Sequence, residues 1–309
     1  MPLPTDTHGT VAVPAFVDLH IHSSHSGDGQ YSPREIFDFA KAAGAGGIAI
    51  SDHDSVRALP EAEALAPKYA FEFVPSVELT TDHEGRELHV LGPFIERDCP
   101  RLTQAIGRQG RARFEQALER IARLRKIGFK ISYEEVSARS KGTTPSGTMI
   151  AAAILDKDLG IGDPLLAPYV SGVRSDRPEL RFYQDFMGKG APAYVPCSWL
   201  GTKEAIELLL SCGAVPILAH PGAGVFNVGE RLIRELKDAG LKGLEVFTSY
   251  HDERASLYYL EIARRLNLIP SSGSDFHGRL KPHVAFGSVR SIGTELIHVL
   301  KGCRQAPES

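Results

Sequence analysis

The chain has 309 residues, of which 42% are hydrophobic and 24% are charged, and this composition is typical of a soluble globular protein. Its formal net charge of −3 argues against a broad basic face for long duplex nucleic acid, although it leaves room for a short basic groove. There is no apolar stretch near the roughly 20 residues of a spanning helix, and the N-terminus lacks the features of a signal peptide. We therefore expect a cytoplasmic protein with no membrane partner.

The four cysteines, Cys99, Cys197, Cys212 and Cys303, are widely spaced and form no Cys-x-x-Cys motif. This spacing is typical of reduced thiols in a cytosolic protein rather than of a disulfide framework. We therefore expect all four to be thiols.

Short apolar runs alternate with helical segments along most of the chain. Each run is expected to be a buried parallel strand, because such strands are covered on both faces. The expected strands cover residues 14–19, 46–51, 71–77, 86–92, 214–219, 242–248 and 267–273. Expected helices cover 33–43, where Ser32 and Glu35 form a capping box, and also 202–213, 229–239 and 252–267. The alternation favours an α/β barrel or a doubly wound sheet.

Residues 98–195 interrupt this alternation with helices and loops. Helices are expected at 101–127, 132–138, 146–156 and 178–188. We therefore predict a barrel formed by residues 1–97 and 196–309, with a helical insertion at 98–195 that could cap a substrate opening. The insertion is locally basic, and a solvated helix face is the simpler explanation for most of its arginines.

Two pairs of metal-ligand-type side chains lie at opposite ends of the chain, each after an apolar run: His20 with His22, and Asp275 with His277. Alternate side chains of a strand point to the same side, so each pair can reach one ion. Active sites of α/β barrels lie at the carboxyl ends of the strands, where these pairs are expected. Further candidates between the pairs are Asp28, Asp52, His53, Glu78, His89 and His220.

Each candidate has a simpler explanation when it is taken alone. A single histidine can be structural, Asp28 can be a turn residue, and Glu78 can be a surface or capping carboxylate. The set as a whole is harder to explain in this way, since mixed imidazole and carboxylate ligands suit manganese, zinc or iron. The sequence contains no P-loop, dinucleotide-binding glycine motif or Gly-x-Ser-x-Gly nucleophile elbow.

Four segments together resemble the signature of the PHP (polymerase and histidinol phosphatase) superfamily of metal-dependent phosphoesterases. They are Asp18-Leu19-His20-Ile21-His22-Ser23, Ser51-Asp52-His53-Asp54, Ala219-His220-Pro221 and Gly273-Ser274-Asp275-Phe276-His277-Gly278. Similarity to the TrpH-like subgroup continues at Glu78-Leu79, at His89-Val90-Leu91-Gly92 and over residues 186–196, and so covers almost the whole chain. The resemblance implies a distorted (β/α)7 barrel with a helical cap. It also implies hydrolysis of phosphate esters of nucleotides or short oligonucleotides.

The resemblance also assigns ligands to two or three divalent metal ions, with Mn²⁺ or Zn²⁺ favoured and Fe²⁺ as a further option. His20, His22, Glu78 and Asp275 would hold the first ion, Asp28, His53 and His277 would serve the second, and Glu78, His89 and His220 would serve the third. Asp52, His53 and His220 are the candidates for orienting groups or moving protons. The candidates for binding the substrate phosphate are Arg108, Arg111, Arg113, Lys189, His251, Arg279 and Lys281.

On this interpretation a hydroxide that bridges the metal ions attacks the phosphorus of a phosphomonoester or small phosphodiester. Two alternatives stay open: hydrolysis of another bond, such as an amide, and a non-catalytic metal-binding scaffold or sensor. One departure concerns the substrate. Where the subgroup has Arg-Pro-His-Ile-Ala, this chain has Gly147-Thr148-Met149-Ile150-Ala151, so the arginine and histidine expected near the substrate phosphate are absent. A different phosphate ester, including a cyclic one, is therefore an option, and the sequence does not specify the oligomeric state.

Overall fold

The computed structural model describes residues 15–140, 144–157, 164–224 and 227–304. The chain forms two compact units: unit 1 comprises residues 1–24, 29–102 and 201–309, and unit 2 comprises residues 25–28 and 103–200. In the described ranges, none of the helices has both the length and the apolar character that crossing a bilayer requires.

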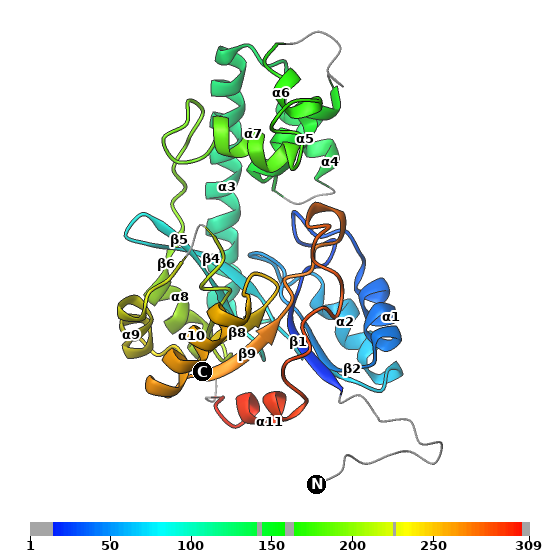
Figure 1. Cartoon of the computed structure of the whole chain (residues 1–309), viewed down its shortest axis with the longest axis vertical. Helices are drawn as coiled ribbons and strands as arrows, with labels where there is room; N and C mark the ends of the chain where they lie inside the picture. The colour runs from blue at the N-terminus through cyan, green and yellow to red at the C-terminus, as the bar shows by residue number, and fades with distance from the viewer. Residues whose placement is uncertain (1–14, 141–143, 158–163, 225–226, 305–309) are drawn as a thin grey trace. The chain divides into compact units, whose positions relative to one another are not determined.

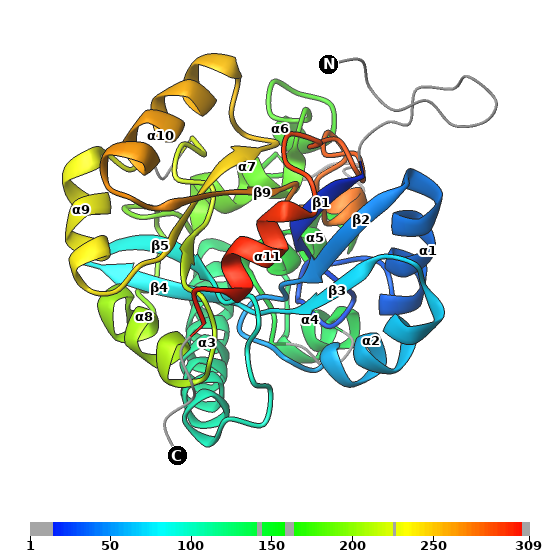
Figure 2. The ribbon, with the colours of Figure 1, turned by 90° about the horizontal axis from the view of Figure 1, so that it is seen from below.

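In unit 1 the first three strands form a parallel sheet next to helices α1 and α2 (Figures 1 and 2). The elements are β1 (Phe16–Ile21), α1 (Pro33–Ala43), β2 (Ala45–Ile50), α2 (Leu59–Leu65), the 3-10 helix η1 (Ala66–Lys68) and β3 (Glu72–Pro75). The capping box of Ser32 and Glu35 begins α1 as expected. Every residue of β1 is buried, including the polar Asp18 and His20 among its apolar side chains. Residue 14 of the first expected strand lies outside the described residues, and α2 is not predicted by the sequence pattern.

The second sheet is mixed, and this corrects the expectation that all strands are parallel. In sheet order its strands are β6 (Leu200–Gly201), β4 (Glu78–His83), β5 (Arg86–Leu91), β7 (Ile217–Leu218), β8 (Gly243–Thr248) and β9 (Ile269–Gly273). β5 runs antiparallel to both β4 and β7, whereas β7, β8 and β9 are parallel. The expected strand at 71–77 ends early, at Pro75, and the chain then begins the β4–β5 hairpin. An apolar run carries no information on strand direction, so the run at 86–92 could not reveal this reversal.

The remaining helices of unit 1 are α8 (Thr202–Ser211), α9 (Glu230–Asp238), α10 (Glu253–Arg265), the 3-10 helix η2 (Gly278–Leu280) and α11 (Glu295–Lys301). The first three confirm the expected helices, and α8, α9 and α10 lie along one side of the mixed sheet in Figure 2. Side chains of both sheets, including Val17 and Ile217, share one core with Ile297 of α11. The two sheets therefore share one hydrophobic core.

Unit 2 has its own apolar core. Its helices are α3 (Pro100–Ile127), which begins at the end of unit 1, and α4 (Tyr133–Arg139), α5 (Gly147–Lys157), α6 (Ala167–Val170) and α7 (Pro178–Phe186). Leu124, Phe129, Ile150 and Phe182 are buried together in this core. The four helices predicted between residues 98 and 195 are confirmed with shifts of one or two residues at their ends.

Cys99 and Cys212 form a disulfide, with their Cα atoms 5.7 Å apart, so the expectation of four thiols is wrong for this pair. Cys99 precedes α3, and Cys212 ends α8. The backbone N–H of Glu96 donates to the carbonyl of Cys212 at 3.1 Å and holds the two segments together. The two cysteines are 113 positions apart, and only the tertiary fold brings them into contact.

Candidate metal centre

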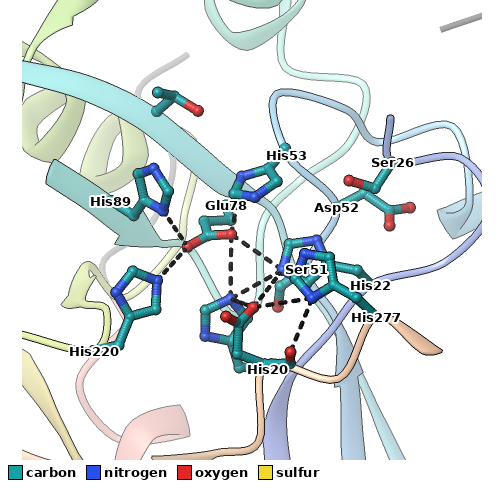
Figure 3. Close-up of polar contacts among 12 residues, drawn as sticks. His20, His22, Ser26, Ser51, Asp52, His53, Glu78, His89, His220 and His277 are labelled. Carbon is teal, nitrogen blue, oxygen red and sulfur yellow. Dashed lines mark hydrogen bonds and ion pairs between the residues drawn. The ribbon is translucent and has the colours of Figure 1, made fainter. Parts of the chain in front are cut away.

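The ends of the strands in unit 1 place histidines and carboxylates in one buried centre (Figure 3). His20 and His22 come from the end of β1, His53 follows β2, Glu78 begins β4, His89 lies in β5, His220 follows β7, and Asp275 and His277 follow β9. Backbone hydrogen bonds fix these strand ends together. Asp275 N–H donates to the His20 carbonyl at 2.8 Å, and Glu78 N–H donates to the Asp52 carbonyl at 3.1 Å. Residues distant in sequence are thereby held side by side.

Glu78 is fully buried, and its two carboxylate oxygens face different histidines. Oε2 lies 3.2 Å from His20 Nε2, 3.1 Å from His22 Nε2 and 3.0 Å from His53 Nδ1. Oε1 lies 3.0 Å from His89 Nδ1 and 3.3 Å from His220 Nε2. Figure 3 shows His89 and His220 on one side of this carboxylate and His22 and His277 on the other. The arrangement is consistent with more than one cation near this carboxylate.

The spacing around His20, His22, Glu78 and Asp275 fits one divalent ion. The Nε2 atoms of His20 and His22 are 3.1 Å apart, and Asp275 Oδ1 lies 3.3 and 3.1 Å from them. Two atoms bound to one ion at about 2.1 Å are separated by about 3.0 Å at octahedral angles and about 3.4 Å at tetrahedral angles. In the described part of the chain, Glu78 Oε2 and Asp275 Oδ1 accept no hydrogen bond although both are buried. Both atoms have the setting expected of cation ligands.

Two further groups overlap with this one. His53, Glu78 and His89 each offer a ligand atom within 4.8 Å of the others, and the same holds for His22, His53 and His277. The rings of His22 and His277 are stacked with centroids 3.9 Å apart. The overlapping clusters are consistent with more than one metal ion. Asp28 belongs to unit 2, where it accepts a 2.6 Å hydrogen bond from Ser26 Oγ, and its part in a second metal site stays a prediction.

Comparison with known proteins identifies a domain of this chain. Residues 18–139 match the model of the PHP domain. The chain therefore contains a PHP domain of the metal-dependent phosphoesterase type. It is 28% identical over 264 residues to a 5'-3' exoribonuclease of Haemophilus influenzae, covering 84% of this chain and 89% of the relative. It is also 28% identical over 268 residues to the 3',5'-nucleoside bisphosphate phosphatase of Chromobacterium violaceum, covering 85% of this chain and 87% of that relative. A solved structure described as an amidohydrolase from Chromobacterium violaceum superposes with a TM-score of 0.77 at 26% identity, covering 96% of this chain and 99% of that one.

Glu245 of β8 supports two residues of this PHP centre and is missed by the sequence analysis. Its Oε1 lies 3.1 Å from His20 Nδ1, and its Oε2 accepts the backbone N–H of His220 at 2.7 Å. A hydrogen bond at Nδ1 leaves Nε2 of His20 available as a ligand. A Cβ on Gly273 would lie 2.3 Å from both Glu245 Oε1 and His20 Cβ, so only glycine permits this approach. The available signal was a single carboxylate inside the apolar run 242–248.

Two other buried carboxylates of the PHP domain fix the backbone around the centre. Asp18 accepts the backbone N–H groups of Ser274 at 2.9 Å and of His20 at 3.2 Å, and burial raises the pKa of Asp18 to about 6. Asp52 accepts both the backbone N–H and the hydroxyl of Ser23 at 2.7 Å. Asp52 therefore orders the segment after β1, and its catalytic role stays a prediction.

Protons on histidines balance the carboxylates of the PHP centre. Burial opposes ionisation of Glu78, yet the charges of His53, His20 and His89 hold its pKa well below the ordinary value. Against the effect of burial, Glu78 raises the pKa of His89 to about 10. Burial lowers the pKa of His22 to about 4, with the charges of His277 and His53 acting in the same direction. A bound cation would therefore displace protons that stabilise the metal-free centre.

The predicted phosphate-binding residues lie in several environments. Lys281 Nζ lies 2.5 Å from Asp275 Oδ2, which also accepts the Tyr250 hydroxyl at 2.5 Å, so Lys281 adjoins the PHP centre. His251 donates from Nδ1 to the Val246 carbonyl at 2.7 Å and accepts the Gly222 N–H at Nε2 at 2.9 Å, so both of its ring nitrogens are occupied. Arg279 is exposed in η2. Arg108, Arg111, Arg113 and Lys189 belong to unit 2, where the guanidinium of Arg113 lies 5.0 Å from the ring centroid of Trp199.

Proposed function

We propose that this protein hydrolyses phosphate esters of nucleotides or short oligonucleotides at the buried centre of unit 1. The position of Glu78 carries the proposal, because each of its oxygens faces a separate group of ligand atoms at distances of 3.0 to 3.3 Å. Two cations held by one carboxylate are the usual device for displacement at phosphorus. The exoribonuclease and the bisphosphate phosphatase to which the chain is similar act on substrates of this class.

When bound, two or three manganese, zinc or iron ions would supply an activated water and neutralise charge on the phosphoryl oxygens. His20, His22, Glu78 and Asp275 would hold the first ion. Asp28, His53 and His277 would serve a second ion, and Glu78, His89 and His220 a third.

The residues around these ligands fix their orientation. Glu245 directs Nε2 of His20 toward Glu78. Tyr250 and Lys281 bind the outer oxygen of Asp275, so that its inner oxygen faces the histidines. His53 and His220, whose rings contact opposite oxygens of Glu78, are the candidates for moving a proton between water and the leaving group. Burial of the centre keeps bulk water from competing for these contacts.

The proposal includes the distorted (β/α)7 barrel and its helical cap. The bond from Asp275 to the His20 carbonyl supports the barrel by linking β1 to the segment after β9, and the bond from Glu78 to the Asp52 carbonyl links the end of β2 to β4. Unit 2, formed largely by residues 103–200, would be the cap, and its Arg108, Arg111, Arg113 and Lys189 are candidates for binding the substrate phosphate.

Phosphate release from a substrate panel tests the proposed function. The protein would be stripped with a chelator and reconstituted with Mn²⁺ or Zn²⁺. The panel would hold nucleoside monophosphates, 3',5'-bisphosphates, cyclic phosphates and short 5'-phosphorylated RNA. We expect metal-dependent turnover on at least one class, with no effect of Asp238→Asn at the exposed end of α9.

Two results would favour the alternatives. Hydrolysis of amides without phosphate release would favour an amidohydrolase. Binding of metal with no turnover on any ester would favour a scaffold or sensor.

A further inference from the structure

Strands β5 and β7 form an antiparallel pair that connects the metal centre with the Cys99–Cys212 disulfide. At one end of the pair, the Ala219 N–H donates to the His89 carbonyl at 3.0 Å. Beyond the other end, the Glu96 N–H donates to the Cys212 carbonyl at 3.1 Å, and the disulfide follows. All of these residues belong to unit 1. The disulfide therefore links the two chain segments at the end of the pair that lies away from the metal centre.

The end of the pair that lies at the centre carries two predicted metal ligands, His89 and His220. Their ring nitrogens, Nδ1 of His89 and Nε2 of His220, lie 3.0 and 3.3 Å from the same oxygen of Glu78. Figure 3 shows both rings on one side of this carboxylate. Metal–ligand distances must stay within about 0.2 Å of their ordinary values. The spacing of β5 and β7 therefore decides whether the two rings can bind one ion together with Glu78.

The pair that sets this spacing is short. β7 consists of Ile217 and Leu218 alone. Pro93 and Pro216 flank the paired residues, and their nitrogens cannot donate a hydrogen bond. The Val215 N–H donates to the Pro93 carbonyl at 3.0 Å and continues the pairing toward the disulfide. Because the linked segments cannot separate while the disulfide is intact, the disulfide limits local opening of this pair.

The two cysteines of the disulfide differ in exposure. Cys212 is fully buried, whereas Cys99 is partly exposed. A thiolate of a dithiol reductant can therefore attack the Cys99 sulfur, form a mixed disulfide with it and release the Cys212 thiol. The second thiol of the reductant then breaks the mixed disulfide. In total, two electrons and two protons pass to the protein, and the reductant becomes an intramolecular disulfide.

We propose that the Cys99–Cys212 disulfide is a redox switch for the side of the metal centre formed by His89 and His220. The intact disulfide holds β5 and β7 at the spacing that lets both rings bind an ion beside Glu78. Reduction by a dithiol releases this spacing and weakens the binding of that ion. The switch rests on the proposed function, since it requires metal ions at the centre.

The ligands of the first ion come from other strands. His20 and His22 lie at the end of β1, and Asp275 follows β9. In the described sheets, neither β1 nor β9 is a neighbour of β5 or β7. Reduction should therefore leave the first ion in place and act on the ion beside His89.

Titration of the full-length, chelator-treated protein with Mn²⁺ in a calorimeter tests the switch. The protein is compared in three states: oxidised, reduced with dithiothreitol that is then removed without air, and reoxidised with glutathione disulfide. We expect reduction to weaken one binding event by about tenfold, as a change in the support of a metal-bound histidine does. The other event should stay within about twofold, and reoxidation should restore both.

Two variants show whether the effect comes from the disulfide. Cys99→Ser should resemble the reduced protein and should not respond to reductant. Cys303→Ser is the matched control, because Cys303 is a free cysteine of unit 1, and this variant should respond as the wild type does. Circular dichroism verifies that each variant is folded. If Cys99→Ser does not fold, the three states of the wild type still give the comparison.

Hydrogen exchange in the metal-free protein gives a second measurement that does not depend on turnover. Reduction should speed exchange in peptides that cover β5 and β7 and leave β1 unchanged. Unchanged exchange at β5 and β7 would overturn the switch, as would equal Mn²⁺ affinities in the oxidised and reduced states or a failure to bind Mn²⁺. Alkylation of all four cysteines without prior reduction would overturn it as well, because it would show that the disulfide is absent. Redox-dependent Mn²⁺ affinity without turnover on any phosphate ester would refute the proposed function and support the switch as a control of metal binding.

Discussion

Replacing Glu245 by glutamine should weaken metal binding about tenfold while leaving the fold intact. Glutamine has nearly the same shape, and its amide oxygen can still accept the His220 N–H that Glu245 accepts at 2.7 Å. The negative charge beside His20 Nδ1, 3.1 Å away, is lost. Hydrogen bonds to charged groups contribute about 1.5 to 3 kcal/mol and neutral ones about 0.5 to 1.5 kcal/mol. The difference of about 1 to 1.5 kcal/mol corresponds to about a tenfold change in affinity, within the range seen when partners of metal-bound histidines are changed.

Titration of the metal-free protein with Zn²⁺ against a competing chelator measures this change. Saturating metal should restore most of the turnover in Glu245→Gln, because no direct ligand is removed. Glu245→Ala should bind metal more weakly still, since it also leaves the buried His220 N–H without its acceptor. Glu235→Gln on the outer helix α9 serves as the control. Affinities of Glu245→Gln and the wild type that agree within about twofold would refute the positioning role of this carboxylate.

Three further predictions concern the same centre. Asp275→Asn should lower turnover by about a thousandfold, since it removes the charge of a predicted metal ligand. The variant should still fold, because asparagine tolerates the φ of 57° at this position. The unfolding midpoint of the variant distinguishes a loss of activity from a loss of stability. Metal loading near neutral pH should release protons, and metal affinity should fall with falling pH, because the pKa of His89 is raised to about 10 and the metal-free protein keeps that proton. A pH indicator in weak buffer measures the release, which His89→Gln should reduce by about one proton. Gly273→Ala should destabilise the protein by about 1 to 3 kcal/mol and weaken metal binding, because its Cβ would lie 2.3 Å from Glu245 Oε1. Denaturant unfolding measures the loss of stability. Gly229→Ala is the control, because the space around Gly229 is open.

Much of the helical structure follows from local sequence, because local interactions determine it. The capping box at Ser32, the helices of residues 98–195 and the helices α8 to α10 are found where the pattern predicts them. The antiparallel β4–β5 hairpin is not, because two short apolar runs separated by a polar turn fit either direction of pairing. The Cys99–Cys212 disulfide likewise depends on a tertiary contact that the cysteine spacing does not encode.

The candidate centre shows the same division. The i, i+2 spacing of His20 with His22 and of Asp275 with His277 can be read directly, and the fold brings both pairs to Glu78. The supporting role of Glu245 could not be predicted, because it depends on a contact between β8 and His20 of β1. The hydrogen bond from the Gly222 N–H to His251 could not be predicted either, because these residues are also distant in sequence. The structure also shows the surroundings of Gly147-Thr148-Met149, where the sequence differs from the subgroup. The Tyr183 ring and the Arg120 guanidinium fill the space that a side chain at Gly147 would occupy.

The Cys99–Cys212 disulfide has a topological consequence for the oxidised protein. It closes a covalent loop that contains residues 100–211, and hence all of α3 to α7. His20, Glu78 and His89 precede this loop in the chain, and Glu245 and Asp275 follow it. One backbone cleavage anywhere inside the loop would therefore leave both halves of the ligand set in a single covalent molecule. The chain could therefore be cut, or given new termini by circular permutation, within the helices α3 to α7. The sequence of these helices could then be varied without separating the predicted metal ligands.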